Sequence, residues 1–138
     1  MGRIISFFIP GNPNAQKRHR DGKGYKYDPS AGDKKDFLIL CHKHKPEAPF
    51  TGPLKVDILA TYSRPKSHYR TGKYSDQLKE NAPYWKITTP DKDNIEKFIY
   101  DSLKGVYWKD DAIICDGRER KIWGDVPGIQ LDVMELEG

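Results

Sequence analysis

Cysteine is scarce in this chain of 138 residues, and long apolar runs are absent. The two cysteines, Cys41 and Cys115, are too few for a disulfide scaffold, and their spacing fits no zinc module. Such sparing use of cysteine is typical of a reduced, intracellular protein, so we expect a cytoplasmic location. No apolar run approaches the roughly 20 residues of a membrane-spanning helix, which predicts a protein without membrane association.

Internal repeats, low-complexity tracts and interdomain linkers are also missing. The length is that of one compact domain, so we expect a single domain over residues 1–138. An aromatic content of 12% argues against disorder. The apolar start, "RIISFFI", lacks a cleavage site of the signal-peptide type and instead predicts a first strand over residues 3–9.

Hydrophobic periodicity predicts the other elements. A helix over residues 30–45 is expected to begin at Ser30 as its cap and to bury Phe37, Leu38, Leu40 and Cys41. Residues 54–63 alternate as a half-buried strand, and residues 112–123 and 127–136 predict two final strands. A second helix, roughly residues 93–103, should bury Ile95, Phe98, Ile99 and Leu103 and end at Gly105. This order predicts a small α+β fold in which helices pack on a mixed β-sheet.

Two pairs of aspartates are unexpected in a chain with 24 basic and 20 acidic side chains. Asp91 and Asp93 fall at the start of the second predicted helix, and Asp110 and Asp111 follow that helix. Helix capping, worth about 0.3–1 kcal/mol, explains one aspartate of the first pair, and a solvated turn explains the second pair. Asp-x-Asp with one further Asp also suits Mg²⁺ and phosphodiester hydrolysis. About 15 Å of helix separates the pairs, so the sequence leaves open whether they meet.

Lys97 lies four residues after Asp93 and therefore shares its helix face. Two interpretations are open. Lys97 either forms an exposed ion pair worth about 0.3–0.5 kcal/mol, or it acts on the scissile phosphate or on the attacking water. Asp101 continues the same face, as a structural partner of Lys97 or as a further ligand.

Basic residues gather in two predicted loops. The first contains Lys17, Arg18, Arg20, Lys23 and Lys26, with Tyr25 and Tyr27 among them. The second, within residues 64–85, is polar with at most a short helix and contains Arg64, Lys66, Arg70 and Lys73. Solvated loops are the common explanation of such runs, whereas binding of phosphates and exposed bases is the functional one.

Four stretches of the sequence carry a more specific signal through their order. They are "FFIPGNPNAQKRHR", "RPKS" at residues 64–67, "TPDKDNIEKFIYDSLKGVYWKDDAII" and "PGIQLDV". The third follows a Pro-Asp-x-Asp-Asn pattern that continues to Trp-x-Asp-Asp. In this order the stretches resemble the RusA family of Holliday junction endonucleases, with His19 at a position where that family commonly has proline.

The resemblance implies a homodimer that depends on Mg²⁺, or on Mn²⁺ as a substitute, and nicks two opposed strands of a four-way DNA junction. Such a reaction belongs to DNA recombination and repair. By position, Asp91, Asp93 and Asp111 match the catalytic, metal-binding carboxylates, and Lys97 matches the essential lysine. Asp110 is the acidic neighbour. We expect DNA contacts from Lys17, Arg18, Arg20, Lys23, Lys66 and Arg70.

Three other interpretations are weaker. Asp91 with Glu119 and Lys121 imitates the Pro-Asp…Glu-x-Lys pattern of restriction-type nucleases, although there the aspartate normally lies on a strand. A nucleic-acid-binding protein without catalysis would leave the acidic residues merely solvated. A metal site from Cys41, His42 and His44 would have only two ligands on one helix face.

Overall fold

The computed structural model describes residues 2–18, 20–22 and 25–138. Four strands form one sheet in the order β1-β6-β4-β5, namely β1 (Ile4–Pro10), β4 (Leu54–Ser63), β5 (Ile114–Gly124) and β6 (Gly128–Glu135). β6 runs antiparallel to β1 and β4, whereas β4 and β5 are parallel. The mixed sheet confirms the predicted α+β class.

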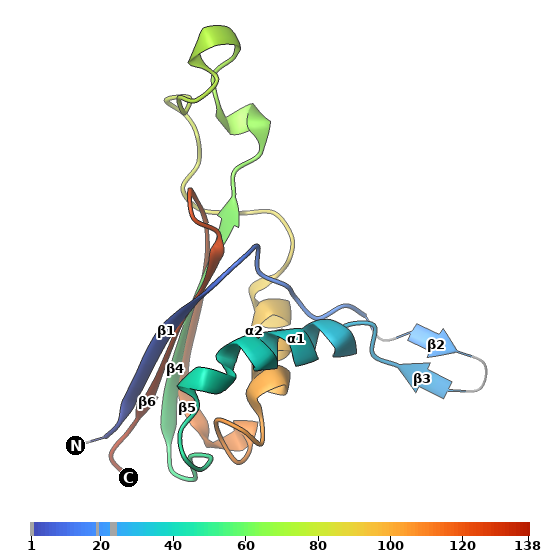
Figure 1. The fold of residues 1–138 in the computed structure, drawn as a ribbon, viewed down its shortest axis with the longest axis vertical. Coiled ribbons are helices and arrows are strands. Elements are labelled where there is room, and N and C mark those ends of the chain that lie inside the picture. The colour runs from blue at the N-terminus through green and yellow to red at the C-terminus, as the bar shows by residue number, and fades with distance from the viewer. Residues whose placement is uncertain (1, 19, 23–24) are drawn as a thin grey trace.

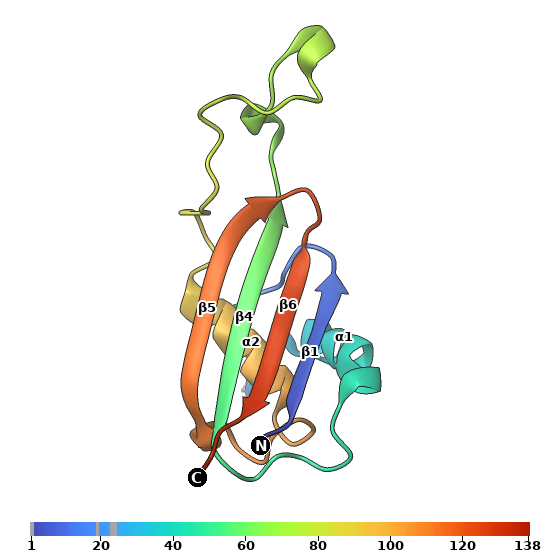
Figure 2. The same cartoon turned by 90° about the vertical axis from the view of Figure 1, so that its left-hand side faces the viewer.

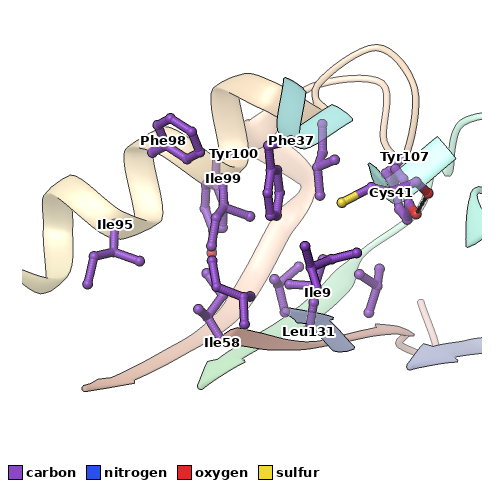
Figure 3. Close-up of a cluster of buried hydrophobic side chains, with 14 of the residues drawn as sticks. Ile9, Phe37, Cys41, Ile58, Ile95, Phe98, Ile99, Tyr100, Tyr107 and Leu131 are labelled. Atoms are coloured by element: carbon purple, nitrogen blue, oxygen red, sulfur yellow. Dashed lines mark hydrogen bonds between the residues drawn. The ribbon is translucent and has the colours of Figure 1, made fainter. Parts of the chain in front are cut away.

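Two helices, α1 (Ala31–Cys41) and α2 (Lys92–Leu103), pack on the same face of this sheet (Figures 1 and 2). The core lies between them and the alternating side chains of β4, of which Leu54, Val56 and Ile58 are fully buried. All four predicted apolar positions of α2 are buried, as Figure 3 shows for Ile95, Phe98 and Ile99. Gly105 has a φ of +85° just after the helix, which confirms the predicted left-handed stop.

Helix α1 departs from its prediction at both ends. Ser30 is the N-cap residue, but its Oγ accepts the backbone N–H of Lys17 at 2.9 Å and caps no amide of its own helix. The helix ends at Cys41 rather than residue 45, and a short 3-10 helix, η1 (His42–His44), follows. Lys45 is extended because Pro46 disfavours the helical conformation at the residue before it.

The predicted apolar face of α1 is only partly buried. Phe37 and Cys41 lie in the core and Leu38 is half-buried, but Leu40 is 52% exposed. Leu40 shares the helical spacing of Phe37 and Cys41 but lies outside the core. The face of α1 that is buried against α2 and the sheet is therefore narrower than the apolar pattern of the sequence indicates.

Short elements occupy the two basic loops. The first contains a small antiparallel hairpin of β2 (Arg20–Gly22) and β3 (Tyr25–Tyr27). The second contains the 3-10 helices η2 (Lys66–His68) and η3 (Gly72–Tyr74), and a further one, η4 (Asp111–Ile113), precedes β5. Residues 64–88 are called the arm below: its first part projects beyond the end of the sheet, and residues 84–88 return alongside β5 (Figures 1 and 2). Within the described residues, no helix has the length and apolarity needed to cross a membrane.

Candidate active site

The start of helix α2 presents two aspartates to solvent. Asp91 is the N-cap residue, and its carbonyl oxygen accepts the backbone N–H groups of Asn94 and Ile95 at 3.1 and 3.3 Å. Within the described residues its carboxylate caps no helix amide, so capping does not account for this side chain. Asp93 lies in the first turn, and both aspartates are exposed. Their carboxylates therefore remain available at the positive end of the helix dipole.

The first basic segment lies directly against this helix start. The backbone N–H of Gln16 donates to the carbonyl oxygen of Asn94 at 2.9 Å. An open pocket of about 460 Å³ is lined by Gln16, Lys17, Arg18, Asn94 and Lys97. Three cations that the sequence placed in two different elements thus share one pocket, and Asn94 of its lining follows Asp93 directly in the sequence.

Asp28 fixes the basic segment to α1. Its Oδ1 accepts the side-chain amide of Gln16 at 2.7 Å and the backbone N–H of Ser30 at 2.9 Å, and its Oδ2 pairs with Lys34 at 2.7 Å. Burial alone would raise the pKa of Asp28, but these hydrogen bonds, that of Lys34 foremost, hold it well below its usual range. The network orders the chain just before it reaches the pocket.

Lys97 makes no ion pair with Asp93 or Asp101 within the described residues. Asp101 instead pairs with Lys34 of α1 at 3.1 Å, so a partnership with Lys97, one of the two alternatives left open for it, is not the one observed. The cation that pairs with Asp101 comes from helix α1, and the spacing of residues along α2 cannot reveal a partner on another helix. The structure thus lacks the simple ion pair that would have explained Lys97, whose exposed side chain lines the pocket instead.

Strand β5 forms another side of the site. In the β4–β5 register, Gly117, Glu119 and Lys121 pair with Val56, Ile58 and Ala60, whose side chains are buried on the helix-covered face. Because paired residues share a face, Glu119 and Lys121 are directed towards α2. The Lys121 Nζ donates to the carbonyl oxygens of Thr88 and Pro90 at 2.7 Å each. It thereby holds the chain immediately before Asp91.

Glu96 and Glu119 bring two further carboxyl groups close to Asp93. Burial, a hydrogen bond with Glu119 and the charges of Glu119 and Asp93 raise the pKa of Glu96 to about 7. Burial and the charges of Glu96, Glu119 and Asp111 also raise the pKa of Tyr100. These shifts show an excess of negative charge along α2 that would favour uptake of a proton or a cation.

Asp110 and Asp111 follow the opposite end of α2, a helix of 12 residues and hence about 18 Å. The Oδ1 of Asp111 accepts the indole N–H of the fully buried Trp108 at 2.8 Å. Asp110 pairs with Lys104 at 3.7 Å and caps η4. No group of three or more His, Cys, Asp or Glu side chains among the described residues is arranged to hold a metal ion. The charge of Asp111 nevertheless acts on Tyr100 together with those of Glu96 and Glu119, and its role as a metal ligand stays a prediction.

The other predicted DNA-binding residues are not among those that line the pocket. Arg20 begins β2, and Lys23 lies outside the described residues. Lys66 and Arg70 are exposed on the arm, where the guanidinium of Arg70 lies 4.2 Å from the ring centroid of Tyr74. The arm and the hairpin of β2 and β3 project in different directions (Figure 1).

Cys41 and His44, near the end of α1, both pack against other parts of the structure. Cys41 is fully buried, and burial raises the pKa of its thiol to about 12. The ring of His44 stacks on Phe7, with a centroid separation of 4.4 Å. These contacts account for both residues by packing.

Sequence reasoning missed the contribution of β5 and Glu96 to this site. The sequence marks Glu119 and Lys121 only through the restriction-type pattern, whose aspartate here opens a helix. Their i, i+2 spacing places both on one face of a strand, which was the available signal. What the sequence lacked was the strand order that places β5 beside α2.

Comparisons with known proteins identify the family of the chain. The family model of endodeoxyribonuclease RusA matches residues 10–134, which include the basic segment, both acidic pairs and Lys97. The uncharacterized protein YqaN of Bacillus subtilis (strain 168) is 29% identical over 138 residues, and the alignment covers 96% of each chain. The family match spans nearly the whole chain, so the resemblance seen in the motifs extends across the fold. The chain belongs to the RusA family of endodeoxyribonucleases.

Proposed function

We propose that this endodeoxyribonuclease resolves four-way DNA junctions by paired symmetric nicks, in DNA recombination and repair. The observation that carries the proposal is the start of α2, where Asp91 and Asp93 lie beside the pocket lined by Lys17, Arg18 and Lys97. Metal-dependent hydrolysis of a phosphodiester uses cationic side chains to stabilise the charge on the phosphate, and oxygen ligands to hold the metal ion. Both kinds of group meet at this point.

The donor chemistry at the helix start fits Mg²⁺, with Mn²⁺ as a substitute. Mg²⁺ is commonly held by one or two carboxylates, with water and substrate phosphate completing its shell, so the exposed Asp91 and Asp93 suffice as protein ligands. The carboxyl groups of Glu96 and Glu119 add negative charge that favours a cation there. When bound, the metal would lower the pKa of a water molecule and stabilise the transition state. Asp111 is proposed as a further ligand on the strength of the family motif alone.

Lys97 has the role of an electrostatic stabiliser. Its ammonium group lines the pocket and is not neutralised by an ion pair within the described residues, so it is available to the phosphate of the scissile bond. Lys17 and Arg18 bind neighbouring phosphates and thereby position the strand. Arg20 and Lys23 extend this surface in the proposal, as Lys66 and Arg70 do on the arm.

A homodimer would match two symmetric cuts on a two-fold symmetric junction. The sheet face opposite the helices offers a surface for it (Figure 2). That face contains Asp57 and Arg120, whose Oδ1 and Nε atoms are buried without hydrogen-bond partners within the described residues. The exposed side chains of Ile4 and Phe8 on this face offer a second copy an apolar contact. Sedimentation should then give twice the chain mass of 15.9 kDa, and a monomer at micromolar concentration would contradict the dimer.

The decisive experiment uses purified protein and a synthetic four-way junction, with a linear duplex of the same sequence as control. We expect paired nicks at symmetric positions with Mg²⁺ or Mn²⁺, none with EDTA, and far slower cutting of the duplex. Cleavage in EDTA, or equal cutting of junction and duplex, would contradict the proposed function.

A further inference from the structure

The arm contains the whole excess of positive charge of the chain. Residues 64–88 include six Lys and Arg against two Asp and Glu, which leaves eighteen of each sign in the rest of the sequence. Residues 71–80 are all exposed. Such a projecting, positively charged segment is suited to a polyanion, and DNA is the polyanion that this enzyme family cleaves.

Two large aromatic side chains are exposed at the base of the arm. Tyr84 is 54% and Trp85 is 56% exposed, and their ring centroids lie 5.0 Å apart with an interplanar angle of 85°. In this edge-to-face arrangement the two rings do not stack on each other. Exposed aromatic rings on a basic segment are the usual means by which proteins hold unpaired bases.

The backbone of the aromatic pair is fixed to the sheet edge. Trp85 forms a bridge with Ile122 of β5, and the backbone N–H of Trp123 donates to the carbonyl oxygen of Tyr84 at 2.9 Å. The ammonium group of Lys86 lies 4.4 Å from the ring centroid of Trp123 and 5.0 Å from that of Tyr62. The rings are therefore presented from an ordered backbone, which reduces the entropy lost on binding.

The pair also lies close to the candidate active site. Trp85 precedes Asp91 by six residues, so at most about 20 Å of extended chain separates them. The intervening segment is held by the hydrogen bonds of Lys121 to Thr88 and Pro90. At about 3.4 Å per nucleotide along a strand, this reach corresponds to roughly six nucleotides.

We propose that Tyr84 and Trp85 form a stacking platform for bases exposed at the branch point of a DNA junction, with the cations of the arm binding the adjacent phosphates. This inference rests on the proposed function, because base faces are accessible only where the duplex is interrupted. It assigns to the arm a preference for branched DNA that phosphate contacts alone cannot give.

The test compares binding of a junction and of a linear duplex in EDTA, where the proposed cleavage does not occur. Trp85→Leu should bind the junction on the order of tenfold more weakly and the duplex unchanged, with the same salt dependence as the wild type. Trp85→Phe keeps a ring and should restore most of the affinity. Lys66→Ala is the phosphate control, since it should weaken both DNAs and lower the salt slope by about one. Ile87→Ala, at a neighbour that is 92% exposed, should change nothing.

A 2-aminopurine base at the branch point reports stacking directly, because its fluorescence falls on contact with an aromatic ring. Wild-type protein should quench it and Trp85→Leu should not. If Trp85→Leu bound the junction as tightly as the wild type, the stacking platform would be refuted. A change in the oligomeric mass of Trp85→Leu would also refute it, because the aromatic pair would then be a protein interface. If Trp85→Leu does not fold, Tyr84→Leu gives the same comparison. A wild type without preference for the junction would instead refute the proposed function.

Discussion

Ionisation of Glu96 should destabilise the metal-free protein as pH rises through neutrality. The pKa of its carboxyl group is raised from 4.5 to about 7 in the folded state. The folded protein therefore binds more protons than the unfolded chain between these values, and the free energy of unfolding falls with increasing pH across that interval. Above about pH 7 the full destabilisation is present, and below about pH 4.5 it is absent.

The shift sets the size of the effect. A rise in the pKa of Glu96 from 4.5 to about 7 corresponds to a loss of at most about 3.4 kcal/mol in the free energy of unfolding. Glu96 is partly exposed, so solvent screens its charge, and we expect about 1 kcal/mol. At pH 8.5 the free energy of unfolding of Glu96→Gln should thus be about 1 kcal/mol larger than that of the wild type. This difference should shrink towards zero as pH falls towards 4.5.

Urea unfolding in EDTA at several pH values measures this difference. The same change at the exposed Glu47 should have almost no effect at any pH, which controls for the general loss of one negative charge. A Glu96→Gln variant that is equally or less stable than the wild type at pH 8.5 would refute the argument. It would mean that Glu96, Glu119 and Asp93 do not repel one another in the folded protein.

Two lysines of the site should behave differently. Lys97→Ala should fold with stability within about 0.5 kcal/mol of the wild type, because no ion pair is lost, yet lose cleavage by on the order of 100-fold; single-turnover cleavage at the native rate would contradict its role. Lys121→Met removes two 2.7 Å hydrogen bonds to Thr88 and Pro90 and should cost about 2 kcal/mol in urea unfolding. It should also slow cleavage of bound junction by more than tenfold, because Asp91 follows the segment that is released; unchanged cleavage would show that the segment is held without it.

The fold was largely predictable because its strongest elements bury a regular pattern. β4 alternates without interruption, and its buried residues Leu54, Val56 and Ile58 were predicted. Four apolar residues at helical spacing made α2 clear. The pattern was less reliable in α1, because Leu40 has the hydrophobicity of a core residue but faces solvent. The periodicity of a sequence shows which helix positions are apolar. How many of these positions are buried depends on the elements that pack against the helix.

The candidate site was predictable only where its residues are close in sequence. Asp91, Asp93 and Lys97 follow from the motif at the start of one helix. Lys121, which contacts the residue before Asp91, comes 30 residues after that aspartate, and its contact depends on the parallel pairing of β5 with β4. Local spacing contains no information about strand order. For the same reason the partner of Asp101, Lys34 of α1, was missed.

The central claim is that the aspartates at the start of α2 serve catalysis rather than capping, and Asp93→Asn tests it most directly. The amide keeps the size of the side chain and suits a helix start, so the fold should survive. It removes a full negative charge where a divalent cation is proposed to bind. On one four-way junction with Mg²⁺, we predict that cleavage falls by at least about 100-fold while binding in a gel-shift assay is unchanged or tighter, because one charge that repels phosphate is gone. Cleavage by Asp93→Asn close to the wild-type rate would contradict the account.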